Sequence, residues 1–485
     1  MFGIGRRTAL AGSRRAAPTP CTRALKQFQP LLSRDFHLTQ TKEASRPTWL
    51  PMRVKTPWID ALTKAREEAA DSKGKAPMGH SKPDLTPRRM SDSYYCARLS
   101  GVASGPGQMA IRLVSQRNGP YQASPVDEIA SSLEHQANSA DRLGALFMDL
   151  DAFAGVIAYR HTGDSVTTVT AAVDRITIEN QLTEICDLEL SGQVTYATGR
   201  SSMEISLQIA KAPVEGEQVK PEDVLITCAF TMVSLDPVTR KPVPVAPLKI
   251  ETEEEKRLFQ KGEANYKAKK SLRQRSLLEQ APNDEESNLI HSMWMREASW
   301  SNPNVVDKRP SNVVFMNDTV LKSAMIMQPQ DRNRHNFMIF GGFLLKQSFE
   351  LAFCCAASFA HARPTFIALD PSTFENPVPV GSVLYLRASV SYTEPEGKDG
   401  EETKFTKVQV RVDTKVRDVE HGTRKSTGMF NYTFLVEKDI QVMPKTYDEF
   451  MIWIDARRRA ENAKGILPGS LGQHALKAME KGLTE

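Results

Sequence analysis

Cysteine is scarce in this chain and is not arranged for a zinc site or a disulfide framework. The 485 residues include six cysteines, and no two of them form a Cys-x-x-Cys pair. They are Cys21, Cys96, Cys186, Cys228, Cys354 and Cys355. We therefore expect free thiols in a reducing compartment, with no metal and no other cofactor. The adjacent Cys354 and Cys355 lie in an apolar run, where we expect both to be buried.

Several sequence signatures of catalysis and binding are also missing. The chain has no Gly-x-Ser-x-Gly elbow, which argues against an α/β-hydrolase, and no Walker-type phosphate loop. Its net charge of +5, part of it near the N-terminus, does not indicate binding to nucleic acid. No stretch predicts a membrane span, because the apolar run after Gly342 is interrupted by Lys346, Gln347 and Glu350.

Acidic residues are absent from the first 34 positions, which hold several Arg, Ser and Thr residues. This composition is typical of a mitochondrial presequence. The sequence "RDFHLT", beginning at Arg34, resembles a matrix-processing site, and acidic residues become frequent soon after it. We predict a presequence over 1–45, a mature protein in the mitochondrial matrix and a poorly ordered segment over 46–90. The alternative is an ordinary disordered basic tail.

The chain contains an internal repeat. "DRITIEN" at 174–180 matches "DPSTFEN" at 370–376 in the pattern Asp-x-x-Thr-x-Glu-Asn. In the same register "LSGQVTY" falls on "LRASVSY", and upstream Gly144 falls on Gly342. Three matches in the same order, at nearly constant spacing, indicate that one unit is present twice.

Each copy has the same predicted elements. A loop containing Asn138 or Asn336 precedes a helix of about five turns that is apolar on most sides. Segments rich in Val, Ile, Thr and Tyr follow and alternate like antiparallel strands. A helix that is apolar nearly all round has to be enclosed. We therefore predict an α+β fold with two tandem domains, each an antiparallel sheet wrapped around a long central helix.

Charge patterning gives the other boundaries. The two predicted domains run over 91–248 and 301–440, with a connector over 249–300 and a C-terminal helix and tail over 441–485. The connector is densely charged and is expected to be a solvent-exposed helix. Thr446 and Glu449 form a capping box that predicts the start of the C-terminal helix.

Two glycines, Gly341 and Gly342, stand where the second long helix is expected to begin. Glycine inside a helix costs roughly 0.5–1 kcal/mol relative to alanine. One interpretation is that the free N–H groups of the helix start hold a developing negative oxygen, as an oxyanion hole. The other is that the glycines only let helix and sheet pack closely, and the local pattern by itself favours this second interpretation.

The ordered set "DLDAFAGVIAYRH", "ATGRSSMEI" and "NRHNFMIFGGFLLKQSFELA" resembles the double-hotdog acyl-CoA thioesterases, particularly the mitochondrial ones. The resemblance covers roughly 90–440. It implies two tandem hotdog domains, hydrolysis of acyl-CoA to a free fatty acid and CoA, and a homo-oligomer, namely a trimer of double-hotdog chains. The hydratase branch of this fold carries Asp-x-Asn-Pro-x-His, which this chain lacks.

The resemblance also implies a composite catalytic site. In this family one hotdog supplies an Asn before its helix, and the other supplies an acid seven positions after the glycine that opens its helix. Counting from Gly144 gives Asp151, which would act with Asn336 of the second copy. The N–H of Gly342 would hold the oxyanion.

The reciprocal site departs from the family pattern. The seventh position after Gly342 is Phe349, and the neighbouring acid is Glu350. Asn138 with Glu350 is therefore interpreted as a degenerate second site, whose groove can still be a place for CoA to bind.

Asp149 competes with Asp151 for the role of the acid. Two residues apart on a helix, their side chains point to different sides, and the apolar pattern does not choose between them. The register from Gly144 selects Asp151, and the alternative is that both are solvated surface acids. The acid can act as a general base on water or attack the thioester to form an anhydride, and the sequence leaves both routes open. The amide of Asn336 would orient the carbonyl or the water.

Three histidines are candidates for functional groups. His335 lies beside Asn336, but a single histidine is more often a structural hydrogen-bonding residue than a base. His161 and His361 stand at the ends of the two long helices, where we expect them as cationic caps.

Binding of CoA phosphates would need basic residues at the rim of the groove. The candidates are Arg200, Arg332 and Arg334. A different class of function is a non-catalytic hotdog scaffold or acyl-CoA sensor in a mitochondrial assembly. Because a scaffold needs neither Asp151 nor Asn336, the presence of both favours the enzyme. The length of the preferred acyl chain depends on packing and is not given by the sequence.

Overall fold

A computed structural model of the chain describes residues 84–466, apart from 104–108, 115–138, 164, 181–186, 214–218, 275–276, 278–279, 305–307, 334–337 and 397–404. The described residues all lie in one unit, Met52–Glu485. The predicted presequence and the candidates Asn138, Arg334, His335 and Asn336 lie outside the described residues. Their roles remain predictions.

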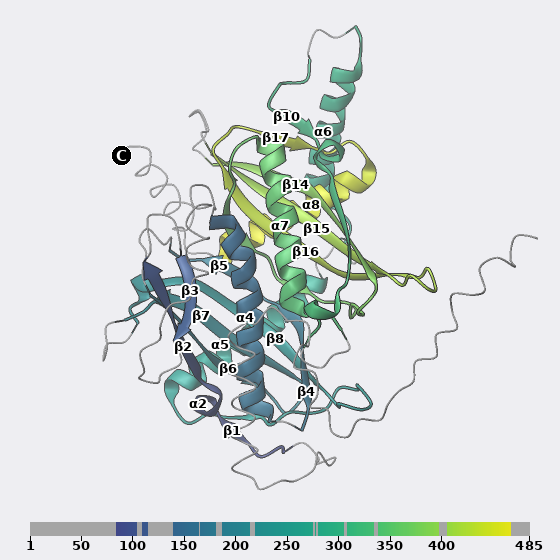
Figure 1. Cartoon of the computed structure of the whole chain (residues 1–485). Coiled ribbons are helices and arrows are strands. Elements are labelled where there is room, and N and C mark those ends of the chain that lie inside the picture. The colour runs from purple at the N-terminus through teal and green to yellow at the C-terminus, as the bar shows by residue number, and fades with distance from the viewer. Residues whose placement is uncertain are drawn as a thin grey trace, which may run out of the picture. The chain divides into compact units, whose positions relative to one another are not determined.

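An antiparallel sheet of 13 strands forms the centre of the fold (Figure 1). Eight of its strands come from two groups that the Val-, Ile-, Thr- and Tyr-rich segments predicted. The first group is β5 (Ile176–Ile178), β6 (Leu188–Ala197), β7 (Ser202–Lys211) and β8 (Val224–Leu235), and the second is β12 (Thr365–Leu369), β14 (Val383–Glu396), β15 (Phe405–Arg417) and β16 (Arg424–Val436). The strands that sequence reasoning missed are β2 (Tyr95–Ala103), β3 (Met109–Val114), β4 (Thr167–Val173), β11 (Leu321–Ile326) and β13 (Ser372–Thr373).

The strands of the two halves form one continuous sheet. Its order is β11-β14-β15-β16-β12-β5-β8-β7-β6-β2-β3, and β4 lies off this path, paired with β8 and β13. The halves meet where β12 pairs with β5. Alternation of buried and exposed residues along the long strands puts one face of each toward the core.

Two long helices, α4 (Ser139–Thr162) and α7 (Gly341–Ala360), run side by side along the sheet in Figure 1. The rings of Phe147 in α4 and Phe349 in α7 meet edge to face with centroids 5.1 Å apart. Among the described residues, α7 is the one helix long and apolar enough to cross a membrane, but half of that window is buried inside this fold. Its apolar surface is thus accounted for by packing against α4 and the sheet.

The same strand pairing occurs in two places at the junction of the halves. The paired residues are Ala368 with Thr177 and Leu369 with Ile176 in one place, and Ala172 with Thr373 and Val173 with Ser372 in the other. Every residue of the first set has its counterpart 196 positions away in the second, which is the spacing of the sequence repeat. Each half therefore lends a strand to the other in the same register.

A second repeated feature lies at the start of each half. Two short parallel sheets pair β1 (Arg88–Arg89) with β9 (Leu248–Lys249) and β10 (Val313–Phe315) with β17 (Gln441–Met443). One short helix follows each first strand: α2 (Met90–Ser93) follows β1, and the 3-10 helix η3 (Met316–Thr319) follows β10. The sequences of these two turns, "MSDS" and "MNDT", match although they were not recognised as part of the repeat.

The hydroxyl groups that end these two turns make the same contacts. Ser93 Oγ accepts a hydrogen bond from Val194 N–H at 3.0 Å, and Thr319 Oγ1 accepts one from Val390 N–H at 3.0 Å. Each hydroxyl also donates to the carbonyl three residues earlier, at 2.7 Å. Both strands then shift register in a β-bulge directly after the valine. The two halves are thus built alike down to single hydrogen bonds.

One amphipathic helix packs on each half through a tyrosine that follows the bulge. Tyr196 lies against Phe259 of α5 (Glu253–Gln274) with ring centroids 5.0 Å apart, and Tyr392 lies against Trp453 of α8 (Tyr447–Ile466) at 5.2 Å. The segment 249–300, expected to be a solvent-exposed connector, therefore has one packed face in α5 as well as its exposed charges. Its second helix is α6 (Asp284–Ser301).

The expected capping box of α8 is present. Glu449 accepts hydrogen bonds from the backbone N–H groups of Lys445 and Thr446, at 2.7 and 3.1 Å. Helix α5 begins with the same device, in which Glu255 accepts the N–H of Thr252 at 3.1 Å. Both helices start where sequence signals place a start.

Two expectations about single residues are wrong. Cys354 is exposed on α7, and only its neighbour Cys355 is buried, because successive helical residues face about 100° apart. Met90, the last residue of the segment expected over 46–90, is fully buried. His161 is fully buried and donates to the carbonyl oxygen of Ala246 through Nε2 at 2.8 Å. Burial lowers the pKa of His161, so it is not a cationic cap.

His361 does end its helix as expected. It is the C-cap of α7, exposed and in the left-handed region with φ of 52°.

Candidate active site

Asp151 is the residue around which the site is built. It lies on α4 with only 1% of its surface exposed. Its Oδ2 accepts a hydrogen bond from the backbone N–H of Gly342, the second residue of α7, at 2.6 Å. Its Oδ1 accepts one from the hydroxyl of Thr170 on β4, also at 2.6 Å. Three elements, two from the first half and one from the second, thus meet at a single carboxyl group.

Two effects act on the pKa of Asp151 in opposite directions. The pKa of Asp151 is raised to about 6, because burial raises it by more than the hydrogen bonds from Thr170 and from Gly342 N–H lower it. The carboxyl also faces the N-terminus of α7, whose partial positive charge favours an anion. The result is a group close to half ionised just below neutral pH, which suits a base or nucleophile working there.

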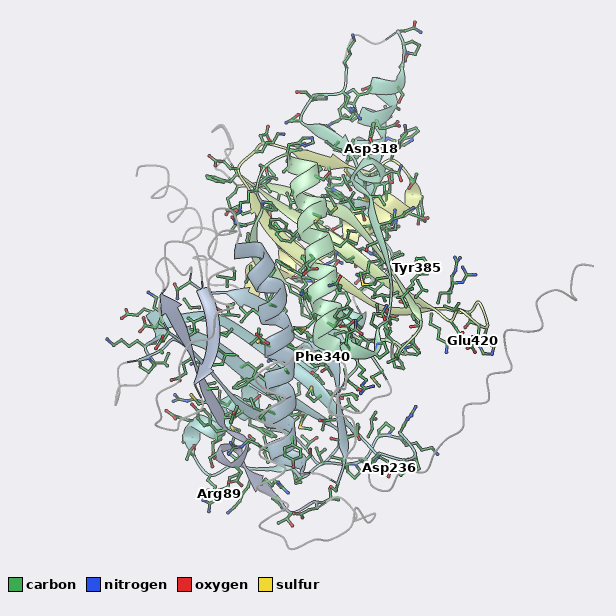
Figure 2. All side chains as sticks on the ribbon, viewed as in Figure 1. Arg89, Asp236, Asp318, Phe340, Tyr385 and Glu420 are labelled. Atoms are coloured by element: carbon green, nitrogen blue, oxygen red, sulfur yellow. The ribbon has the colours of Figure 1, made fainter. Side chains whose placement is uncertain are left out.

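Close contacts explain the two glycines at the start of α7. A Cβ on Gly342 would lie 2.8 Å from Met148 Cα and 3.0 Å from Met148 O, so α4 and α7 can approach this closely only at a glycine. A Cβ on Gly341 would lie 3.0 Å from Asp151 Oδ2. Close packing and presentation of an N–H group to the acid are therefore the same feature. Figure 2 labels Phe340, the N-cap of α7, which makes no side-chain capping bond.

A cavity of about 330 Å³ opens beside Asp151. One side is formed by α4, β4 and β8, where apolar residues such as Gly155, Val169 and Met232 accompany Asp151 and two threonines. The other side is formed by Asn333, by the residues that precede α7 and by 374–378, which include the exposed Glu375. The lining is mostly apolar; its part around Gly155 is called the apolar end, and its part with Asn333, Glu375 and Asn376 is called the polar end. This arrangement is typical of a small-molecule site.

The structure places the competing acid elsewhere. Asp149 is on the same helix, and burial raises its pKa to about 6, but it does not line this cavity. The register from Gly144 therefore selected the acid that reaches the start of α7. Asp151 is buried and Asp149 is partly buried, so the alternative of two solvated surface acids is wrong.

Thr170 is the site residue that sequence reasoning missed. It lies in "TTVTAAV", a stretch with two other threonines, and no motif distinguishes it. A β-bulge between Thr170 and Ala172 turns this part of β4. Only the pairing of β4 beside α4 shows that its hydroxyl reaches Asp151.

In the candidate second site the structure describes Glu350 and Gly144, while Asn138 lies outside the described residues. Glu350 is part-exposed and interacts with Lys346, 3.8 Å away, and with the side-chain amide of Gln347 at 3.2 Å. Gly144, the counterpart of Gly342, lies five residues inside α4, because that helix begins at Ser139. An N–H group at this depth is bonded within its own helix and is not available to a substrate.

Phenylalanine occupies the positions that correspond to the cavity. The helix spacing of 198 relates Asp151 to Phe349 and Gly155 to Phe353. The matching bulges in β4 and β12 relate Thr170 to Phe366, and the register of those strands with β8 and β16 relates Met232 to Phe434. All four residues of the first half line the cavity.

The four rings fill the corresponding space by contacting one another. Phe349 meets Phe366 at 5.5 Å, Phe434 at 6.1 Å and Phe353 at 6.5 Å, measured between ring centroids. Phe434 also meets Phe353 at 6.2 Å and Phe366 at 6.0 Å. These separations are those of favourable aromatic pairs. The vacant second groove expected from sequence is therefore occupied by the protein's own side chains.

The basic candidates differ in position. Arg332 is half-buried and bridges to Ile339, a residue of the cavity wall, and its neighbour Asn333 lines the cavity. Arg200 is exposed, donates to the hydroxyl of Tyr266 at 3.4 Å and does not line the cavity. Among the described residues, no group of three or more His, Cys, Asp or Glu side chains is placed to hold a metal ion.

Comparison with known proteins identifies relatives of this chain. No family model matches the chain. The human acyl-coenzyme A thioesterase 9, mitochondrial, is 32% identical over 442 residues, covering 89% of this chain and 90% of that protein. The mouse protein of the same name is 30% identical over 439 residues, covering 88% and 89%. Acyl-coenzyme A thioesterase 2, chloroplastic, of Humulus lupulus is 34% identical over 312 residues, covering 63% and 69%.

A solved structure is similar to part of the chain. An acyl-CoA hydrolase from Staphylococcus aureus, in complex with butyryl coenzyme A, coenzyme A and coenzyme A disulfide, is 22% identical, covers 36% of this chain and 99% of its own, and has a TM-score of 0.28. The sequence relatives give the stronger result, since the human protein matches along nearly the full length of both chains. This protein belongs to the family of mitochondrial acyl-coenzyme A thioesterases.

Proposed function

We propose that this chain hydrolyses acyl-CoA thioesters to a free fatty acid and CoA in the mitochondrial matrix. The observation that carries the proposal is the contact between Asp151 and the Gly342 N–H at the start of α7, beside a mostly apolar cavity that also carries Asn333, Glu375 and Asn376. An acyl-CoA combines a hydrocarbon chain, which the apolar lining would take, with a charged carrier, which the polar residues would contact.

The thioester carbonyl would lie between the start of α7 and Asp151. In the free protein the Gly342 N–H is donated to Asp151, and on binding it would be donated to the carbonyl oxygen instead. Negative charge that develops on this oxygen is stabilised by backbone N–H groups and by the helix dipole. The transfer of the N–H also removes one hydrogen bond that lowers the pKa of Asp151, so the acid becomes more basic when substrate is bound.

Two routes use Asp151 from this position. As a general base it takes a proton from water, the hydroxide adds to the carbonyl carbon, and the C–S bond breaks as the proton passes to the CoA thiolate. As a nucleophile it adds to the carbonyl carbon, the thiolate leaves, and water hydrolyses the mixed anhydride. A single turnover in water labelled with ¹⁸O tests the second route: label in the Asp151 carboxyl identifies the nucleophile, because water then opens the anhydride at the Asp151 carbonyl.

Thr170 and Asn336 take supporting roles in this proposal. The Thr170 hydroxyl holds Oδ1 of Asp151 and so fixes the direction of the other oxygen. Asn336, two residues before the described wall residue Met338, is proposed to orient the carbonyl or the water through its amide. Arg332 is proposed to contact the carrier at the polar end, together with Arg334, while Arg200 is assigned a lesser part.

We infer a tandem double-hotdog arrangement with one working site per chain. The equal registers at the junction, the repeated bulges and the paired Ser93 and Thr319 contacts support the duplication. The proposed domains keep the boundaries 91–248 and 301–440. The four phenylalanines support a single site in each chain, since they leave no space for the reaction in the second half.

Assembly and targeting complete the proposal. A trimer of such chains would have a mass about three times the 54.0 kDa of one chain, less the presequence, which light scattering after gel filtration measures. Removal of the presequence is tested by N-terminal sequencing of protein from isolated mitochondria, which should begin between about 35 and 45. A mature chain beginning at Met1 would contradict the targeting proposal.

The deciding experiment is release of free thiol from a panel of acyl-CoAs of different chain lengths. The expected result is turnover of at least one member by the purified protein and almost none by Asp151→Asn. If acyl-CoA binds without any release of thiol, the chain is the non-catalytic scaffold or sensor.

A further inference from the structure

Gly155 is an unusual residue in the middle of α4. It lies 16 residues after the start of a 24-residue helix, one turn beyond Asp151 and on the same face. Glycine in a helix interior is destabilising relative to alanine, because it has the most backbone freedom to lose on folding. A glycine in this position therefore needs a reason that offsets this loss.

Neither packing nor backbone geometry supplies that reason. A Cβ built on Gly155 meets no atom within 4 Å, whereas one on Gly342 would collide with the backbone of Met148. Gly155 is also absent from the glycines with positive φ in the described chain. The helix would accept alanine here without strain and would gain stability from it.

The empty space beside Gly155 belongs to the cavity at Asp151. Gly155 lines this cavity together with Ala152 on α4, Val169 on β4, and Met232 and Val233 on β8. Met232 is 3% exposed, and the walls here carry no charged side chain. The polar residues Asn333, Glu375 and Asn376 line the opposite end.

The other half of the molecule shows what a side chain at this position does. The counterpart of Gly155 is Phe353 on α7, whose ring lies 6.2 Å from that of Phe434, the counterpart of Met232. In that half the corresponding space is filled. The same backbone framework thus accepts a large side chain at this point, and its presence closes the space.

We propose that Gly155 sets the length of the acyl chain that the site accepts, with Met232 as the facing wall. This inference rests on the proposed thioesterase function. With the thioester held between Asp151 and the start of α7, the hydrocarbon chain takes the apolar end and passes Gly155 one helical turn from the carboxyl. The carrier leaves through the polar end, at Asn333 and Glu375.

The test is a series of substitutions at this position, Gly155→Ala, Gly155→Val and Gly155→Leu, assayed by kcat/KM over the acyl-CoA panel. A hydrophobic pocket distinguishes substrates by about 10–200-fold per methylene that no longer fits. We expect Gly155→Ala to lose at least about tenfold on the longest accepted chains while the shortest are hydrolysed as before. Gly155→Val and Gly155→Leu should move the limit to shorter chains in turn.

Stability provides the second readout. Gly155→Ala should raise the melting temperature by about 1–3 °C, because it adds helix propensity without a clash. Gly155→Ala is therefore expected to fold, even if Gly155→Val and Gly155→Leu do not. The matched control is Phe353→Leu in the filled half, which should lower the melting temperature and leave the chain-length profile unchanged.

The outcomes distinguish failure of the role assigned to Gly155 from failure of the proposed thioesterase function. If the wild-type protein releases thiol and the Gly155 variants keep its chain-length profile, the role of Gly155 is wrong and the proposed function stands. If the wild-type protein hydrolyses no acyl-CoA, the proposed function itself fails. A profile that moves equally in Phe353→Leu would also overturn the assignment, since the effect would not be local to the cavity.

Discussion

The two halves of this protein share a framework and differ in what fills it. The first half keeps a carboxyl, a glycine, a threonine and a methionine around an open space, and the second half places a phenylalanine ring at each corresponding position. The registers, the bulges and the hydroxyl contacts around these positions are the same. The shared framework therefore allows either an open site or a filled core. The side chains at the four corresponding positions determine which of the two is present.

This difference has an energetic consequence. A buried aromatic cluster stabilises a fold by the apolar area it removes from water and by its edge-to-face contacts. An open cavity with a buried acid gains neither, and the raised pKa of Asp151 shows that its ionised form is disfavoured where it stands. We expect the second half to hold the fold together and the first half to carry the chemistry, and each prediction below separates these roles.

The largest effect is expected from Asp151→Asn. The amide keeps the shape of the side chain but cannot take a proton or attack, so kcat should fall by about 10²–10⁴-fold. The matched control is Asp149→Asn, two residues away and partly buried, which should keep most of the activity. A dead Asp149→Asn beside an active Asp151→Asn would show that the assignment is wrong by two residues.

Asp151→Asn should also be more stable than the wild-type protein at alkaline pH. The folded-state pKa of Asp151, about 6, lies above its ordinary value of 3.8, so folding takes up a proton between these pH values. The stability that belongs to the protonated acid is fully present below pH 4 and is lost as pH rises through 6. At pH 8, Asp151→Asn should therefore raise the free energy of unfolding by about 1–3 kcal/mol. Urea denaturation at pH 4 and pH 8 measures this, and the gain should disappear at the lower pH.

Phe349→Ala should lower the stability of the fold and leave the activity almost unchanged. Removing the central ring of the aromatic cluster leaves a cavity and should cost about 3–5 kcal/mol of folding stability. Because the ring is remote from the reacting atoms, kcat per folded molecule should change little at temperatures well below the melting transition. Denaturant titration and active-site-normalised kinetics test the two parts. Loss of kcat in fully folded protein would show that the two halves are coupled.

The pH dependence should report the acid of the first half. Hydrolysis needs ionised Asp151, so kcat/KM should fall about tenfold per pH unit below a midpoint near 6. Thr170→Val removes a hydrogen bond that lowers this pKa and should move the midpoint upward. The midpoint in kcat should lie above that in kcat/KM, because bound substrate takes the Gly342 N–H from Asp151. Equal midpoints in both profiles would mean that the N–H stays on the acid.

The smallest effect is expected at the degenerate site. Glu350→Gln removes a part-exposed charge that faces Lys346, and such pairs contribute about 0–1 kcal/mol. Activity should change by no more than a few-fold, as it should for Asn138→Ala, whereas Asn336→Ala is expected to be strongly impaired. If Glu350→Gln were as inactive as Asp151→Asn, both halves would have to be treated as catalytic.

Much of this comparison could be predicted from the sequence. The spacing of the repeat, the eight strands rich in branched residues, the glycine start of α7 and the capping box of α8 all follow from local composition and period. The same register selected Asp151 and showed that its counterpart is Phe349. These features depend on residues close together in the chain, where sequence patterns are informative.

Contacts between distant residues were decided only by the tertiary structure. The hydrogen bond from Gly342 to Asp151 joins residues 191 positions apart, and no periodicity records it. Thr170 belongs to a strand that the pattern did not reveal, and the "MSDS" and "MNDT" turns were too short to recognise as copies. The four extra residues at the start of α4 enclose Gly144 in its helix. The sequence determined which residues each copy carries, and the packing of α4 against α7 decided which of them meet, because burial, pKa and access to a free N–H exist only once both halves are folded together.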